Sequence, residues 1–289
     1  MTVSDPQVVQ ANGVDICVQT FGDPTDPVVL LVMGSSASMD WWEDEFCERL
    51  ADGSRFVIRY DHRDTGQSVS YEPGAPPYSF GDLVDDAVDL LDHFGLAGAH
   101  VVGMSMGGGL AQMMAVDHPD RVESLTLIST APAAPGPDDP DLPGMSEETV
   151  AAFTGAQSPD WSDRDSVIEY CVHLARVSAA QSVAFDEEPF RELAGRVFDR
   201  TINIESSYTN HNHIAGGERV RERLPGLHLP TLVLHGTEDP VVPFGNGVVL
   251  ANEIPTARLV TLEHTGHELP RRVWDIVIPA ILEHTAGAG

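Results

Sequence analysis

The chain has 289 residues, 42% of them hydrophobic, and carries 45 acidic against 16 basic residues for a formal net charge of −29. These numbers fit one large domain or a domain with an insertion, and they exclude wholesale disorder. So negative a surface repels nucleic acid and anionic lipid, and we expect neither as a partner. The acidity would attract a cationic substrate or suit high salt, but we favour the simpler explanation of a solubilising surface.

The cysteines and the first residues indicate where the protein works. Cys17, Cys47 and Cys171 are widely spaced and form no CxxC pair, so we expect neither a disulfide framework nor a zinc site. The opening MTVSDPQ lacks the basic and apolar regions of a secretion signal, and no apolar run is long enough to span a bilayer. We therefore expect a cytoplasmic protein without a membrane partner. The oligomeric state is not predicted.

Up to about residue 130, short apolar runs alternate with amphipathic segments. The runs predict strands buried on both faces and the segments predict helices, after a hairpin around Asn12-Gly13. The expected strands cover 28–34, 55–61, 100–104 and 122–130, and the expected helices cover 38–51, 80–96 and 108–118. This alternation predicts an α/β fold with a mostly parallel, twisted sheet flanked by helices.

A proline-rich stretch at 131–144 interrupts this alternation. Only helical patterns follow it, at 146–155, 162–178, 187–200 and 206–212. Strand patterns return at 229–236 and 257–263, and a closing helix is expected at 270–284. We therefore predict a core domain made of residues 1–130 and 225–289, with residues 131–224 inserted as a helical cap over the active edge of the sheet.

The sequence GMSMG (103–107) places Ser105 at a sharp turn between an expected strand and an expected helix. It fits G-x-S-x-G, a turn that holds a serine hydroxyl out beyond the carboxyl end of a parallel strand. A Cβ at 103 or 107 would collide with its neighbour there, and the turn aims the amide of Met106 at a bound acyl group. A glycine-rich turn with an incidental serine would leave the same local pattern.

Two residues near the C-terminus make the catalytic interpretation stronger. A serine hydroxyl needs a base to remove its proton, and the base needs a third group to fix its tautomer. Asp239 follows the expected strand 229–236, and His267 follows the strand 257–263, so both reach the sheet edge of Ser105. Their order in the chain, Ser then Asp then His, is the one expected when this kind of sheet carries the triad.

These motifs resemble the α/β-hydrolase superfamily over nearly the whole chain. The resemblance rests on the LLVMG strand end, on Asp61, Arg63, Gly66 and Ser68, on the GMSMGG elbow, and on the GTEDPVVP and TGHELP loops. VMGSSASMDWW, RYDHRDTGQS and the residues around PTARL are most similar to the aclacinomycin methylesterase type, which removes a methyl ester from a polyketide. The helical insert, which selects the substrate, shows the least similarity.

The resemblance implies a role for each matching residue. Ser105 would be the nucleophile, His267 the base and then the acid, and Asp239 the group that orients it. The backbone N–H groups of Ser35 and Met106 would form the oxyanion hole. The chain departs from the family pattern at Met33, where histidine is common, and at Asp64, which replaces a glycine in D-x-R-G.

Several neighbours could take the same roles. Glu238 could orient the base instead of Asp239, but it would have to point the other way from the turn. His264, Ser36 and Ser38 are more simply explained by packing or loop hydrogen bonds. Three further features have both a structural and a functional explanation, and we favour the structural one for each. They are His211-x-His213 as surface or cap-lining histidines rather than metal ligands, Trp41 and Trp42 as core and seam, and Asp186-Glu187-Glu188 as a helix N-terminus.

The sequence thus predicts a serine carboxylic-ester hydrolase, of the carboxylesterase class, that acts on a small to medium ester through an acyl-serine intermediate. It predicts no metal and no organic cofactor. A cofactor-free haloperoxidase or perhydrolase would use the same triad, and a hydrolase-like ligand receptor that turns over slowly would retain it. The sequence leaves open the natural ester and the shape of the pocket beneath the cap.

Overall fold

The computed structural model describes residues 2–133, 139–214, 217 and 219–287. Its described residues contain one eight-stranded sheet in the order β1-β2-β4-β3-β5-β6-β7-β8. The strands are β1 (Gln7–Ala11), β2 (Val14–Phe21), β3 (Val28–Val32), β4 (Phe56–Tyr60), β5 (Ala99–Met104), β6 (Val122–Ile128), β7 (Thr231–Gly236) and β8 (Ala257–Leu262). β1 pairs with β2, and β2 with β4, in antiparallel fashion, whereas every later pair is parallel. The predicted α/β fold with a mostly parallel sheet is confirmed.

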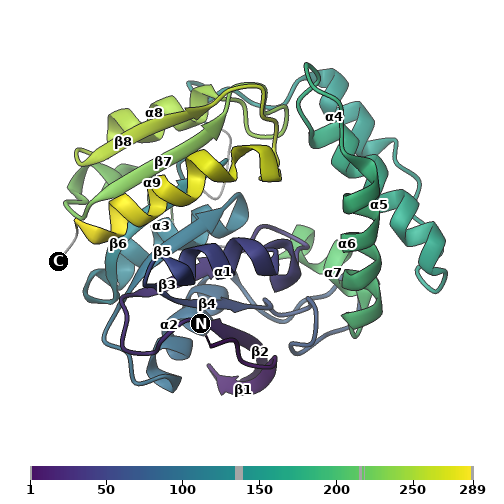
Figure 1. Ribbon diagram of the computed structural model, residues 1–289. Helices are drawn as coiled ribbons and strands as arrows, with labels where there is room; N and C mark the ends of the chain where they lie inside the picture. Colours follow the sequence, from purple (N-terminus) through teal and green to yellow (C-terminus); the bar gives the residue numbers. More distant parts are fainter. Residues whose placement is uncertain (1, 134–138, 215–216, 218, 288–289) are drawn as a thin grey trace.

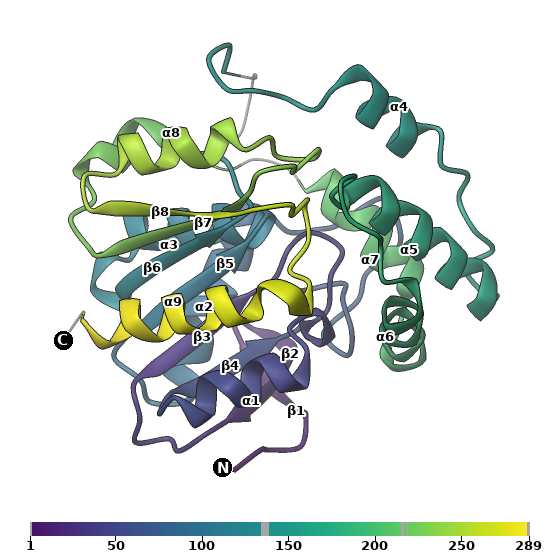
Figure 2. The same cartoon turned by 45° about the horizontal axis from the view of Figure 1, so that its top comes forward.

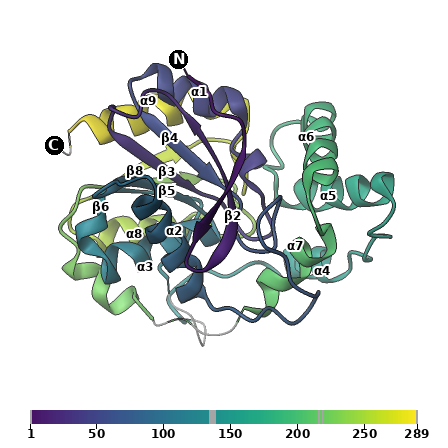
Figure 3. The ribbon, with the colours of Figure 1, turned by 90° about the horizontal axis from the view of Figure 1, so that it is seen from below.

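Helices cover both faces of the sheet (Figure 2). On one face α1 (Asp44–Asp52) and α9 (Trp274–Ala286) pack over the strands, and on the other lie α2 (Phe80–His93), α3 (Met106–Asp117) and α8 (Gly245–Glu253). Figure 3 shows these two layers edge-on. Short 3-10 turns complete the described core: η1 (Met39–Trp41), η2 (Pro119–Arg121), η4 (Arg221–Gly226) and η5 (Arg271–Val273). Two separate apolar clusters fill the two faces, as a sheet buried on both sides requires.

The helices between β6 and β7 lie to one side of the sheet (Figure 1). They are α4 (Glu147–Thr154), α5 (Arg164–Ser178), α6 (Glu187–Arg200) and α7 (Ile204–Asn210), followed by the turn η3 (His211–His213). α5 and α6 share an apolar cluster of their own, which includes Val167, Val172 and Leu193. We call α4 to α7 with η3 the cap helices. The division of the chain at 131 and 224 remains a prediction, and both boundaries lie near residues outside the described ranges.

One element prediction was wrong, and one helix was not predicted. The helix expected over 38–51 is instead η1 followed by α1, with a break at Trp42 and Glu43. The guanidinium of Arg59 donates a hydrogen bond to the carbonyl of Trp42, which diverts this carbonyl from helical bonding. α8 was missed, because two glycines in GNGVVLANE hide its pattern.

Four histidines beside the strands are almost completely buried: His62, His100, His211 and His235. Burial disfavours the imidazolium form, and it lowers the pKa of His62 to about 3 and that of His100 to about 4. The pKa values of His211 and His235 are lowered for the same reason. The folded protein therefore keeps these rings neutral at pH values where an exposed imidazole is charged.

Acid should destabilise the protein through these rings. Below the unfolded pKa of about 6.5, the unfolded chain binds protons that the folded chain does not. Each of these rings therefore lowers the free energy of unfolding by up to about 1.4 kcal/mol for every pH unit of acidification. Urea unfolding at pH 7.5 and 5.5 should show a loss of more than about 2 kcal/mol. The loss should be smaller in His100→Gln, which lacks one of the rings. Equal free energies of unfolding at the two pH values would contradict this account.

Candidate active site

Ser105 is the single residue between β5 and α3, and its backbone is strained. Its φ of 54° and ψ of −122° lie in a region that residues other than glycine rarely adopt. The surrounding chain holds it there, because its N–H donates to the carbonyl of Ile128 at 2.9 Å and its carbonyl accepts from the N–H of Gly108 at 2.9 Å. The turn at GMSMG is thus the sharp elbow that the sequence predicts.

The glycines at the elbow permit two close backbone approaches. A Cβ on Gly103 would lie 2.3 Å from the carbonyl oxygen of Gly107. A Cβ on Gly107 would lie 2.1 Å from the carbonyl oxygen of Val32, at the end of β3. No side chain fits at such distances, so both positions need glycine for reasons of space alone.

The three side chains predicted to act together form one hydrogen-bonded row. Nε2 of His267 lies 2.9 Å from Oγ of Ser105, and Nδ1 of His267 lies 2.9 Å from Oδ2 of Asp239. Ser105 follows β5, Asp239 follows β7 and His267 follows β8, so the row forms where the carboxyl ends of parallel strands meet. In this arrangement a neutral imidazole donates from Nδ1 and accepts from the serine hydroxyl at Nε2.

The carboxylate of Asp239 is fully buried and held by more than the imidazole. Its second oxygen, Oδ1, accepts hydrogen bonds from the N–H groups of Val241 at 2.9 Å and Val242 at 2.8 Å. These donors satisfy a charge that would otherwise be costly to bury. The carboxylate is therefore fixed in position to orient His267.

The cap helices support the histidine loop, which the sequence analysis did not foresee. The N–H of His267 donates to the carbonyl of Ser178, at the end of α5, at 2.7 Å. Gly266 passes so close that a Cβ there would lie 2.3 Å from the same carbonyl oxygen. Apart from Gly266 in the motif, no sequence signal identifies this contact, because it depends on how α5 ends.

The loop after β3 lies against Ser105. A Cβ on Gly34 would stand 3.3 Å from Cβ of Ser105, which puts the next residue, Ser35, beside the elbow. The N–H of Met106 belongs to the first turn of α3, where amides point out of the helix without a partner in it. Within the described residues, the N–H groups of Ser35 and Met106 donate to no protein acceptor. Both are free to bind an oxygen at the elbow.

The chain matches the family described as the alpha/beta hydrolase fold over residues 27–270. It belongs to this family. It is 32% identical to rhodomycin D methylesterase DauP of Streptomyces sp. strain C5, over 98% of both chains, and equally to the methylesterase DnrP of Streptomyces peucetius. The esterase EaEST of Exiguobacterium antarcticum is similar in fold, with a TM-score of 0.77 and 22% identity over 96% of this chain and 98% of its own. The resemblance stated from the motifs is confirmed.

The departure of this α/β-hydrolase at Asp64 has a structural explanation. Asp64 has a positive φ of 66°, the conformation that glycine would supply at this position. Its buried carboxylate accepts hydrogen bonds from the hydroxyl of Tyr78 at 2.6 Å and from Nδ2 of Asn210 at 2.9 Å. Since Asn210 ends α7, the unusual aspartate ties the cap helices to the core.

A second buried carboxylate in the same turn makes a similar link. Asp61 accepts two hydrogen bonds from the guanidinium of Arg200, at 2.6 and 2.7 Å, and Arg200 also pairs with Asp40. Arg200 is the last residue of α6, so this ion pair joins the cap helices to the end of β4. Gly66 is required here, because a Cβ would lie 2.2 Å from Oδ2 of Asp61.

The residues that could have replaced members of the row make other contacts. Glu238 points away from His267 and accepts hydrogen bonds from Ser182, with His264 beside it at 3.1 Å. Ser38 donates to Asp40 and is a loop hydrogen-bonder, as expected.

The tryptophan pair and the acidic cluster lie where the structural explanations place them. Trp42 is fully buried in the core, while Trp41 packs on Phe190 of α6 with ring centroids 5.1 Å apart. Glu187 pairs with Arg176 and Arg191 at the start of α6.

The histidine pair His211 and His213 divides into a buried and an exposed member. We expected both at the surface or lining the cap, and His213 is exposed. His211 is instead buried, and each of its ring nitrogens is hydrogen-bonded to core backbone. Among the described residues no group of three or more His, Cys, Asp or Glu side chains is arranged to hold a metal ion.

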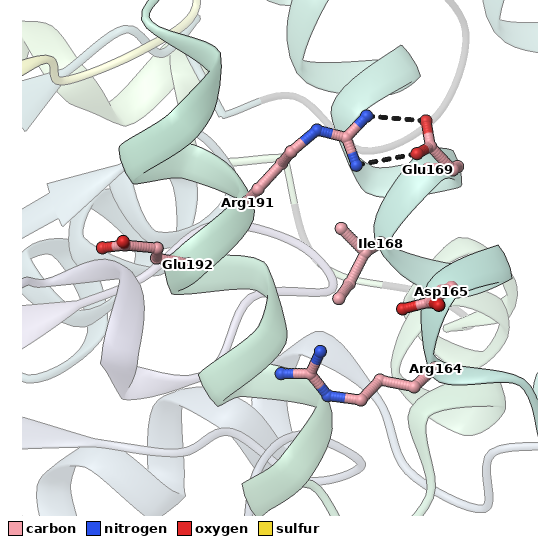
Figure 4. Close-up of a pocket in the computed structure, with 6 residues that line it drawn as sticks. All are labelled: Arg164, Asp165, Ile168, Glu169, Arg191 and Glu192. Carbon is pink, nitrogen blue, oxygen red and sulfur yellow. Dashed lines mark hydrogen bonds and ion pairs between the residues drawn. The ribbon is translucent and has the colours of Figure 1, made fainter.

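A cavity of about 500 Å³ lies between α5 and α6 (Figure 4). It is lined by Arg164, Asp165, Ile168, Glu169, Arg191 and Glu192. Its arginines are paired, Arg191 with Glu169 and Arg164 with Asp199. None of the lining residues belongs to the row at Ser105, and we assign the cavity no part in the chemistry.

In the described chain no helix is long and apolar enough to cross a membrane.

The close approach at Gly107 can be tested by stability. Gly107→Ala should lower the free energy of unfolding by at least about 2 kcal/mol, because backbone rather than a flexible side chain blocks the new methyl group. Gly109→Ala is the matched control in the same helix, since its Cβ would meet only Ala133 at 4.0 Å. Urea unfolding followed by circular dichroism should show Gly109→Ala unchanged or more stable. Equal stability of the two variants would contradict the crowding described here.

Proposed function

We propose that this α/β-hydrolase is a serine carboxylic-ester hydrolase that acts through an acyl-serine intermediate. One observation carries the proposal: Ser105, His267 and Asp239 form an unbroken row with two contacts of 2.9 Å where the carboxyl ends of the parallel strands meet. An ordinary serine hydroxyl is a weak nucleophile, and such a row is the arrangement that activates it.

The first half of the reaction forms the acyl-enzyme. Oγ of Ser105 attacks the ester carbonyl carbon while Nε2 of His267 takes the hydroxyl proton. The negative oxygen of the tetrahedral intermediate is bound by the N–H groups of Ser35 and Met106, at the N-terminus of α3. The imidazolium, stabilised by Asp239, then protonates the departing alcohol.

The second half regenerates the enzyme. Water attacks the acyl-serine, His267 accepts the proton of the water, and the acid departs as Ser105 is reprotonated. The chain and water supply every proton and electron pair of this scheme, so the proposal calls for no metal or organic cofactor.

We further propose that the natural substrate is a small to medium ester, a methyl ester of a polyketide-like compound. The similarity to two rhodomycin D methylesterases, at 32% identity over 98% of this chain, supports this.

The setting of the enzyme is also a proposal. Cys17, Cys47 and Cys171 are free and buried, which fits the reducing cytoplasm. The strong negative charge supports a small molecule, and neither nucleic acid nor a membrane surface, as the partner.

The roles in the row can be separated by replacement. Ser105→Ala should abolish hydrolysis of p-nitrophenyl butyrate, and Asp239→Asn should lower kcat about 10⁴-fold, because the imidazole loses the acceptor that fixes its tautomer. Glu238→Gln is the matched control next in the chain, and it should keep kcat within about threefold. A fluorophosphonate should label the wild type and not Ser105→Ala. A large loss in Glu238→Gln with little in Asp239→Asn would reassign the orienting carboxylate.

The substrate class can be tested with a panel of esters. An aromatic polyketide carrying a carboxylic methyl ester should lose methanol with a higher kcat/KM than its ethyl and butyl esters, followed by mass spectrometry. A stoichiometric burst without steady turnover would instead indicate a receptor. Faster peracid formation from acetate and peroxide than ester hydrolysis would indicate a perhydrolase.

A further inference from the structure

The loop Met33–Ser36, which carries the N–H of Ser35, lies between two buried histidines. On one side, Nε2 of His62 lies 2.9 Å from the carbonyl oxygen of Met33. On the other, the N–H of Ser36 donates to Nδ1 of His211 at 2.9 Å. His62 follows β4 in the core, whereas His211 comes from the end of the cap helices.

The second nitrogen of His211 fixes its tautomer. Nε2 of His211 lies 2.9 Å from the carbonyl oxygen of Arg63, and a carbonyl oxygen only accepts hydrogen bonds. Nε2 therefore carries the proton, which leaves Nδ1 with a lone pair for the N–H of Ser36. Only the neutral ring can make both bonds, so His211 acts as a bridge between two core loops.

The environment of His211 favours this neutral bridge. Its side chain is 4% exposed, and burial is the main reason that its pKa is lowered. The ring of His62 faces it with centroids 6.0 Å apart, and the carboxylate of Asp64, which opposes the shift, is occupied by donors from Tyr78 and Asn210. Both rings stay uncharged beside the loop.

The loop needs such a support. Ser36 has a φ of 64°, a left-handed conformation that costs a non-glycine residue about 1 kcal/mol or more. Gly34 packs directly on Ser105. Without an acceptor for the N–H of Ser36 the strained loop is free to relax, and a shift of about 1 Å in an oxyanion donor is enough to weaken it severely.

We infer that His211 is a positioning residue for catalysis: it holds the loop Met33–Ser36 so that the N–H of Ser35 points at the developing oxyanion. This inference rests on the proposed function, since it assigns a support to the oxyanion hole of that reaction. It also means that the cap helices complete the hole, because its support comes from the end of α7.

The test compares two replacements of one ring. His211→Phe fills the space but accepts no hydrogen bond, and it should lower kcat for p-nitrophenyl butyrate between about 10-fold and 100-fold, with KM within about threefold. His211→Gln offers an oxygen and an N–H at similar spacing and should recover kcat to within about fivefold of wild type. His213→Gln, in the same turn but exposed, is the matched control and should behave as wild type.

A transition-state analogue gives the readout that a purely structural role would not move. An alkyl trifluoromethyl ketone forms a tetrahedral oxyanion on the serine, so its affinity should fall in His211→Phe by the same factor as kcat/KM. Rates are expressed per active site titrated with a fluorophosphonate, so unfolded protein does not count. If the Phe variant does not fold, His211→Leu, which also accepts no hydrogen bond from the N–H of Ser36, replaces it with the same expected loss.

The outcomes separate this inference from the proposed function. Wild-type kcat and analogue affinity in His211→Phe, or an equal loss in the Gln and Phe variants, would overturn the role of His211 while Ser105→Ala still identifies the nucleophile. A wild type that neither hydrolyses esters nor reacts with the fluorophosphonate would overturn the proposed function itself.

Discussion

The close approach of the elbow to the end of β3 is the constraint on which the site depends. Only because residue 107 has no side chain can the start of α3 lie against the carbonyl of Val32. That approach places the strained Ser105 beside Gly34, and therefore beside the amide of Ser35. The same turn exposes the first amides of α3, so one packing contact arranges the hydroxyl of Ser105 and the N–H groups of Ser35 and Met106 together.

The sheet supplies the other two groups without further local constraint. β7 and β8 run parallel to β5 and end at the same edge, so the loops after them carry Asp239 and His267 to Ser105. What the loops must still fix is orientation. The N–H groups of Val241 and Val242 do this for the carboxylate, and the carbonyl of Ser178 does it for the histidine backbone.

Much of this arrangement could be predicted because it follows from local patterns. The alternation of apolar runs predicts the strands, and a parallel sheet brings residues 105, 239 and 267 to one edge wherever they lie in sequence. The strand-end loops predict the triad for that reason. The buried position of His211 could not be predicted, because it depends on the orientation of α7, and a histidine pair at i, i+2 gives the same signal at a surface. The break at Trp42 depends on Arg59, a partner that is distant in sequence.

The cap helices are tied to the core at several points. Three of their ends contact the loops of the site: α5 through Ser178 and His267, α6 through Arg200 and Asp61, and α7 through Asn210 and Asp64. Asp61 and Asp64 lie in one turn and are nearly fully buried, yet they are satisfied differently.

An arginine compensates the first carboxylate, and hydroxyl, amide and backbone donors compensate the second. Because each carboxylate has a partner from the insert as well as donors from the core, docking of α6 and α7 stabilises the shape of the turn. Arg63 lies in the same turn, and its carbonyl accepts a hydrogen bond from His211, whose other nitrogen accepts from the N–H of Ser36. Docking of the insert is therefore coupled to the geometry of the loop beside Ser105.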